Sequence, residues 1–342
     1  MPDGSVISDQ GESALKIDAL SKHFVSNGQP VKALKRVELT VRPGTVTGLI
    51  GPDGAGKTTL MRLIAGLLVP DEGEISVFGR DAVADPLSVQ QIIGYMPQHF
   101  GLYEDLTVSE NMNLYADLQG LPVAQRSARY EELTRLTGLA PFGDRLAGDL
   151  SGGMKQKLGL ACVLVRPPRL LLLDEPTVGV DPVSRRELWA IVYRLVRQEN
   201  MTALLSTAYL DEAERCGEVI LLHKGEKLGQ GAPETFSRTV AGRCFQVTLP
   251  GTNKRSLQGR LARLAGVIDA TIQRTGIRVV MDQPSTPDVS AWSDGITVEP
   301  VPPRFEDGFI SLLHEKDGHS PPAALSLDRP RTTPSSGNAR DM

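Results

Sequence analysis

The chain of 342 residues carries a formal net charge of −4 at pH 7 and is 40% hydrophobic and 23% charged. A slightly acidic chain gives no overall reason to expect nucleic-acid binding, and no apolar run approaches the roughly 20 residues that span a bilayer. The start, MPDGSVISDQGESALK, lacks the basic and apolar segments of a signal peptide. We therefore expect one large and one smaller domain, without transmembrane helices and without a nucleic-acid partner.

Residues 1–13 are polar and predict a flexible N-terminus. Over residues 14–236, short apolar runs alternate with helical patterns, which is typical of a mostly parallel α/β sheet. The predicted strands are Val46–Ile50, Leu170–Leu173, Ala203–Leu205 and Val219–Leu222. The predicted helices are Lys57–Leu68, Ser151–Val165, Pro182–Gln198 and Asp211–Cys216. Because the strands are apolar along their length, we expect both faces of the sheet to be buried.

Residues 237–314 show a different pattern. Arg243–Leu249 and Ile277–Met281 are predicted strands, and Pro302–Leu313 is a predicted closing helix, so we expect a small C-terminal α+β appendage. Residues 315–342 are rich in Pro, Ser and Arg, a composition that predicts a disordered tail.

The strongest local motif is GPDGAGKT, which stands between a predicted strand and a predicted helix. It matches the phosphate-binding P-loop pattern, in which glycines let backbone N–H groups curl around phosphate oxygens at a helix N-terminus. Lys57 would reach the β- and γ-phosphates, and Thr58 would ligate Mg²⁺. The predicted nucleotide-binding residues are Gly51, Pro52, Asp53, Gly54, Ala55, Gly56, Lys57, Thr58 and Thr59.

Two further motifs fit beside a P-loop. The strand in LLLLDE ends in Asp174, which would hold Mg²⁺, and Glu175, which would orient and polarise an attacking water. The alternative is a strand followed by a solvated acidic turn. In LSGGMKQK, Ser151 predicts a helix N-cap, and the paired glycines would let a phosphate approach the backbone. The alternative there is an ordinary capped helix.

Taken together, these motifs resemble the ATP-binding cassette (ABC) ATPases. LSGGM is similar to the signature of that family and precedes the Asp174–Glu175 strand, as the family requires. Over residues 15–236 the resemblance implies a P-loop NTPase fold with a helical signature subdomain at about residues 98–165. GPDGAGKTTLMRLIAGLL, GYMPQHFGLYEDLTV and LSGGMKQKLGLAC further resemble the first cassette of YbhF-type tandem ATPases of multidrug exporters, and PRFEDGFISLL resembles the regulatory segment of drug-export (ABC-2 type) cassettes.

The resemblance assigns further roles. Phe24 would stack on adenine, with a core aromatic as the alternative; Gln98 would be a magnesium and water ligand; and Asp181 would belong to the D-loop. In the family, two cassettes pair head to tail around ATP, so the signature would serve the partner's ATP. The signature residues are Ser151, Gly152, Gly153 and Met154. The segment after Gln98 would dock on a membrane subunit, which predicts exposed side chains at Phe100, Leu102, Tyr103 and Leu106.

One position departs from the family pattern. In STAYLDEAERC, the family's switch histidine, which contacts the γ-phosphate, is replaced by Ala208. A methyl group donates no hydrogen bond, so this site should bind ATP well and hydrolyse it slowly. The alternative is that Ser206, Thr207 or Tyr209 takes over the role.

The resemblance implies the ATPase subunit of an exporter that couples cassette dimerisation to transport. Its partners would be ABC-2 type transmembrane permease subunits and a second cassette, identical or different. The chain would then sit peripherally on the cytoplasmic face of the membrane. Alternatives are a soluble ABC ATPase acting on ribosomes or DNA, and a P-loop switch or kinase. A ribosome-type protein carries two cassettes and a DNA-repair type a long coiled-coil insertion, and the chain shows neither.

Overall fold

The computed structural model describes residues 13–26, 28–99, 101–289 and 295–318. These residues form two compact units. One contains the described residues up to Thr239 together with Arg304–Phe309, and the other contains Val240–Pro303 and the described residues from Ile310 onward. None of the helices within the described ranges is long and apolar enough to cross a bilayer.

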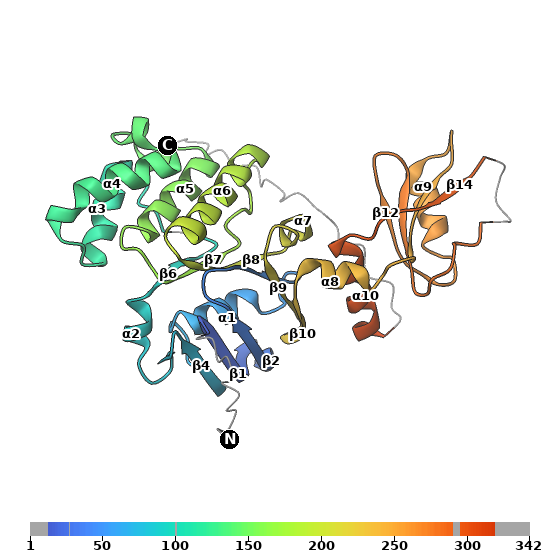
Figure 1. The fold of residues 1–342 in the computed structure, drawn as a ribbon, viewed down its shortest axis with the longest axis horizontal. Coiled ribbons are helices and arrows are strands. Elements are labelled where there is room, and N and C mark those ends of the chain that lie inside the picture. The colour runs from blue at the N-terminus through green and yellow to red at the C-terminus, as the bar shows by residue number, and fades with distance from the viewer. Residues whose placement is uncertain (1–12, 27, 100, 290–294, 319–342) are drawn as a thin grey trace, which may run out of the picture. The chain divides into compact units, whose positions relative to one another are not determined.

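A six-stranded sheet forms the centre of the first unit (Figure 1). The strand order is β10-β9-β3-β8-β7-β6, and all neighbours are parallel except β10, which runs antiparallel to β9. The strands are β3 (Val46–Ile50), β6 (Ile93–Met96), β7 (Leu170–Asp174), β8 (Thr202–Thr207), β9 (Glu218–His223) and β10 (Glu226–Gly231). β3, β7 and β8 are buried along their whole length, which confirms the predicted strands and their two covered faces.

A second, antiparallel sheet in this unit has the order β2-β1-β4-β5 and was not predicted. Its strands are β1 (Leu15–Ser26), β2 (Gln29–Val41), β4 (Glu72–Val77) and β5 (Arg80–Asp81). Helix α1 (Lys57–Ile64) lies between the two sheets (Figure 1). One hydrophobic core joins all three elements and includes Leu39, Leu60 and Leu172. The helix that begins at the P-loop is therefore fixed from both sides.

The first unit contains seven further α-helices among its described residues. They are α2 (Pro86–Gln90), α3 (Val108–Leu118), α4 (Val123–Thr137), α5 (Gly152–Val163), α6 (Pro182–Gln198), α7 (Leu210–Ala213) and α8 (Pro233–Arg238). Figure 1 shows α3, α4 and α5 gathered near β6, the edge strand. Ser151 caps α5, since its Oγ accepts a hydrogen bond from Met154 N, as the sequence predicts. The predicted helix Lys57–Leu68 is too long: α1 ends at Ile64, and Gly66 turns the chain with a φ of 66°.

The second unit is an antiparallel sheet of order β12-β13-β11-β14. Its strands are β11 (Cys244–Thr248), β12 (Val267–Ile272), β13 (Ile277–Met281) and β14 (Thr297–Pro300). Leu257 and Leu261 of α9 (Lys254–Leu261) pack with Phe245, Val247 and Val279 of the sheet. The predicted strands at 243–249 and 277–281 are confirmed. α10 (Phe305–Asp317) replaces the predicted helix Pro302–Leu313. The disordered tail predicted for 315–342 is wrong at its start, because α10 continues to Asp317. Residues 319–342 lie outside the described residues, and a regulatory role for this unit stays a prediction.

Candidate nucleotide-binding site

The P-loop connects β3 to α1 and is shaped by two glycines in the left-handed region. Gly54 has a φ of 76° and Gly56 a φ of 106°. A Cβ atom at Gly56 would also lie 2.6 Å from Ala33 O, so this position tolerates no side chain. Helix α1 begins without a side-chain cap and without an acidic residue in its first turn. Its first N–H groups and its dipole therefore favour an anion at this end.

Lys57 stands at the centre of the site. Its Nζ lies 2.9 Å from Glu175 Oε1, and the two side chains are 4% and 10% exposed. The same ammonium donates to Gly51 O at 2.8 Å. Gln98 Nε2 donates to the other carboxylate oxygen, Glu175 Oε2, at 3.1 Å. Three residues predicted for the site, from three separate segments, thus meet within hydrogen-bond distance.

Ser206 fixes the two carboxylates that follow β7. Its Oγ donates to Asp174 Oδ1 at 2.7 Å and accepts a hydrogen bond from Glu175 N at 2.9 Å. Glu175 has a φ of 50°, a left-handed conformation that a non-glycine residue adopts only when its surroundings enforce it. The serine therefore holds a strained carboxylate residue in place. The sequence analysis weighed Ser206 only as a replacement for the switch histidine and missed this role.

Asp174 is fully buried, and its Oδ2 atom has no hydrogen-bond partner among the described residues. A buried carboxylate oxygen without a donor is costly, and it suits a cation or a cation-bound water. Thr58 starts the same helix as Lys57 and is half-buried, as are its neighbour Thr59 and Gln98. The oxygens present fit Mg²⁺, a hard cation that takes one or two carboxylates and substrate phosphates.

Phe24 lies on the β1–β2 hairpin, with Val31 as its partner on the opposite strand. Its side chain is 39% exposed, and Lys22 Nζ lies 5.7 Å from the ring centroid. The ring is therefore not a core aromatic, which removes the alternative from the sequence analysis. A stacking role on adenine remains a prediction.

The signature residues do not join the cluster around Lys57: no hydrogen bond or ion pair of the described ranges links them. They lie instead against the D-loop. A Cβ atom built on Gly153 would be 2.2 Å from Ser184 Oγ and 3.3 Å from Asp181 Oδ2. Asp181 caps α6 by accepting hydrogen bonds from Val183 N and Ser184 N. Gly152 and Met154 complete the first turn of α5, where Gly152 is exposed.

Ala208 is exposed at the end of β8, and its three possible replacements are already engaged. Ser206 serves the two carboxylates, Thr207 Oγ1 accepts from Tyr209 N at 3.0 Å, and the Tyr209 ring lies 4.3 Å from the Arg185 guanidinium. Of the three, only Ser206 contacts the carboxylates of the site.

Arg185 belongs to a cluster that sequence reasoning did not detect. Its Nε lies 3.6 Å from Glu212 Oε1, and Glu212 is fully buried. Thr177 Oγ1 donates to Glu212 Oε2 at 3.0 Å. The cluster ties α6, α7 and the turn after Glu175 together. No local sequence pattern predicts this cluster, because the DEAE sequence is equally typical of an exposed helix start.

A groove of about 430 Å³ lies between α2, β6, α3 and the end of α5, and its lining includes none of the described residues between Gln98 and Leu106. Leu87 and Leu118 line the groove and are each 70% exposed. Tyr103 is 56% exposed, as predicted, whereas Leu102 and Leu106 are half-buried, so that part of the prediction was wrong. Phe100 lies outside the described residues.

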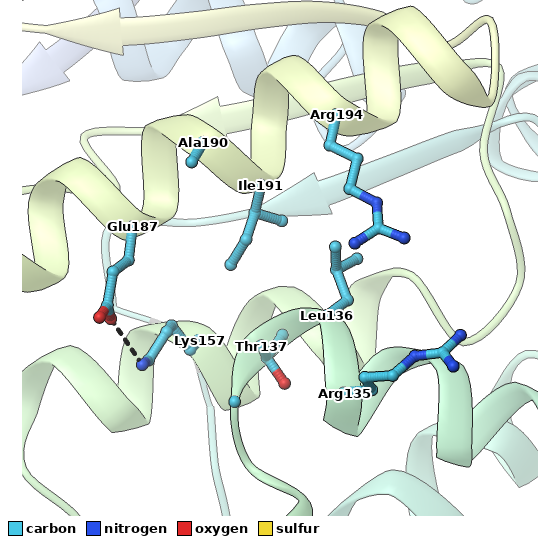
Figure 2. A pocket seen from close by; sticks show the side chains of 9 residues that line it. Arg135, Leu136, Thr137, Lys157, Glu187, Ala190, Ile191 and Arg194 are labelled. Carbon is cyan, nitrogen blue, oxygen red and sulfur yellow. Dashed lines mark hydrogen bonds and ion pairs between the residues drawn. The ribbon is translucent and has the colours of Figure 1, made fainter.

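A second cavity, of about 340 Å³, lies between α4, α5 and α6 (Figure 2). Leu136, Ala190 and Ile191 form its apolar part. At its edge, Lys157 Nζ and Glu187 Oε2 are 2.8 Å apart and neutralise each other. It shares no residue with the cluster around Lys57, so we do not count it as part of the nucleotide site.

A mostly parallel sheet, a P-loop between β3 and α1, and a carboxylate pair at the end of β7, which β8 separates from β3, define a P-loop nucleotide-binding protein. Comparisons with known proteins give the family: residues 34–178 match the sequence profile of the ABC transporter family. The daunorubicin resistance ATP-binding protein DrrA3 of Streptomyces coeruleorubidus is 36% identical over 77% of this chain and 82% of its own length. The chain belongs to the ABC transporter family.

Other relatives and solved structures are similar to the same family. The chain is 48% identical over 94% of its length to the probable multidrug ABC transporter ATP-binding protein YbhF of Escherichia coli, although it spans only 56% of that protein. Among solved structures, an ATP-binding subunit of an ABC transporter is 30% identical, with a TM-score of 0.60 over 73% of this chain and all of that one. The cassette MJ0796, solved as a dimer bound to ADP and Pi, is 25% identical, with a TM-score of 0.59 over 64% of this chain and 98% of that one.

The two glycines of the signature should respond differently to the same small change. Gly153→Ala should lower the free energy of unfolding by about 1–3 kcal/mol, because the new methyl group overlaps Ser184. Gly152→Ala should leave it nearly unchanged, since only Gly179 O lies as near as 3.9 Å to the added atom. Urea denaturation of both variants measures the difference. Equal stabilities would show that Ser184 moves aside without cost.

Proposed function

We propose that the chain binds and hydrolyses ATP with Mg²⁺ as the cassette of an ABC exporter. The observation that carries the proposal is the meeting of Lys57, Glu175 and Gln98 beside the P-loop and the unpaired oxygen of Asp174. Thr58, Gln98 and Asp174 would hold the metal ion. Bound magnesium would neutralise phosphate charge as a Lewis acid.

The residues of the chain can exchange partners when a nucleotide enters. The Lys57 ammonium now pairs with Glu175 and with carbonyls of its own loop. A phosphate held by the P-loop amides would compete for that ammonium. Glu175 would then be released from Lys57 and could accept a hydrogen bond from a water in line with the γ-phosphate, still oriented by Gln98. Phe24 would stack on the base.

A second cassette completes this arrangement. No hydrogen bond or ion pair of the described residues links the signature to the chain's own P-loop cluster, which supports a role at the ATP of a partner cassette. The signature residues are Ser151, Gly152, Gly153 and Met154. The exposed N-terminus of α5 offers backbone N–H groups to such a phosphate. Asp181 sits directly behind it and would place the D-loop at the same interface. The partner is either a second copy of this chain or a different cassette.

The groove beside β6 is the proposed docking surface for an ABC-2 type permease subunit. Two leucines that are each 70% exposed on one groove are unusual for a surface that stays in water. A short apolar segment of a membrane subunit would cover them. The chain would then lie peripherally on the cytoplasmic face of the membrane, and the names of its relatives favour multidrug efflux as the transported class.

Loss of the Lys57 ammonium should strongly weaken nucleotide binding. Lys57→Ala should weaken ATP affinity by about 100-fold, the size of a lost hydrogen bond between charged groups. Lys157→Ala, which also breaks one lysine–glutamate ion pair, is the matched control and should bind normally. Titration with a fluorescent ATP analogue gives both constants. Unchanged affinity in Lys57→Ala would refute the nucleotide site.

Docking should depend on the exposed leucines of the groove. Leu118→Glu should reduce the fraction of the chain that sediments with membranes when its permease is co-expressed. Val123→Glu is the control, because Val123 is 77% exposed but does not line the groove. Equal sedimentation of wild type and Leu118→Glu would exclude this docking surface.

The proposed low turnover at Ala208 has its own test. Ala208→His should raise steady-state ATP hydrolysis, by up to about 10²-fold, because imidazole adds a donor toward the γ-phosphate. The exposed position gives the ring room. Adding Glu175→Gln should abolish the gain, whereas ATP affinity should barely change. A wild type that already turns over rapidly and gains nothing from histidine would show that the site is compensated.

A further inference from the structure

Two buried polar atoms beside the proposed metal site have no hydrogen-bond partner among the described residues. They are Tyr95 Oη and Asp174 Oδ2. A phenol carries one donor, and an ionised carboxylate only accepts. Because one atom can donate and the other can accept, the two are chemically complementary. Leaving either atom unpaired in the interior costs free energy.

The sheet places them on the same face. Tyr95 on β6 is the parallel partner of Leu172 on β7, and Asp174 follows Leu172 by two residues. Since alternate residues of a strand share a face, both side chains lie on the side of the sheet that α1 covers. Burial and the Asp174 carboxylate raise the pKa of the Tyr95 phenol, and the Arg62 guanidinium of α1 opposes them. The phenol therefore stays protonated and able to donate.

Tyr95 also lines the groove beside β6, together with Tyr115 and Leu118. Tyr95 therefore lines the groove and also lies close enough to the Asp174 carboxylate for that charge to raise the pKa of its phenol. Ser206 uses one lone pair of Asp174, and a tyrosine donor would use a second. The remaining lone pairs would face the metal or its water. Outer partners of this kind orient a metal-holding carboxylate and set its affinity.

We propose that Tyr95 is a positioning residue for the metal site: its hydroxyl donates to Asp174 Oδ2, and its ring forms the wall of the groove. The inference rests on the proposed function, because it assigns a partner to the carboxylate that would hold Mg²⁺.

The test uses the full chain with a non-hydrolysable ATP analogue and Mn²⁺ as a spectroscopic substitute for magnesium. Paramagnetic resonance gives the Mn²⁺ dissociation constant. Tyr95→Phe should raise that constant roughly tenfold, while affinity for the analogue in chelator, without metal, stays at the wild-type value. Tyr115→Phe is the matched control: it removes a hydroxyl that lines the same groove but donates to Gly101 O, and it should bind Mn²⁺ like the wild type.

The outcomes separate the two proposals. A Mn²⁺ constant in Tyr95→Phe equal to that of the wild type overturns the positioning role. Equal losses of metal and metal-free nucleotide affinity also overturn it, because they indicate a merely structural effect. A wild type that binds no analogue at all instead refutes the nucleotide site itself.

Discussion

The buried ion pair between Lys57 and Glu175 is the interaction on which the rest of the site depends. Each charge is almost wholly removed from water, and neither would be stable there without the other. The lysine follows β3 and the glutamate follows β7, two strands that are separated in the sheet only by β8. Parallel strands bring their carboxyl ends to one edge, and that edge is where the P-loop, the carboxylates and Gln98 converge.

The ion pair makes the site responsive to a phosphate. In the proposed function a nucleotide would draw Lys57 away from Glu175. This exchange would leave a strained carboxylate residue, held at its N–H by Ser206, with an oxygen available for water. The same engagement of Ser206 bears on the proposed effect of Ala208. The neighbours that could substitute for a histidine are committed to the carboxylates, to the turn at Tyr209 or to Arg185. In the proposed function, ATP binding and ATP turnover would therefore be set by different residues.

The edge strand β6 contributes both to the candidate site and to the groove. One end leads into Gln98, which contacts Glu175, and its side chains form a wall of the groove with Leu87 and Leu118. A segment bound in that groove would rest on the strand that supports the site. Coupling between the groove and the site would not need a long chain of contacts, because β6 pairs directly with β7, the strand that ends in Asp174.

The sequence by itself determined the local chemistry. GPDGAGKT and LLLLDE specify their own backbone, a glycine turn before a helix and a buried strand before two carboxylates, so short-range physics identifies them. The caps at Ser151 and Asp181 are local for the same reason. Only the tertiary structure decided which groups meet. The Glu212–Arg185–Thr177 cluster and the dual use of Ser206 join residues more than 25 positions apart, and the antiparallel sheet of β1, β2 and β4 forms through pairing that no single segment specifies. Burial made those contacts obligatory, and burial is a property of the folded chain as a whole.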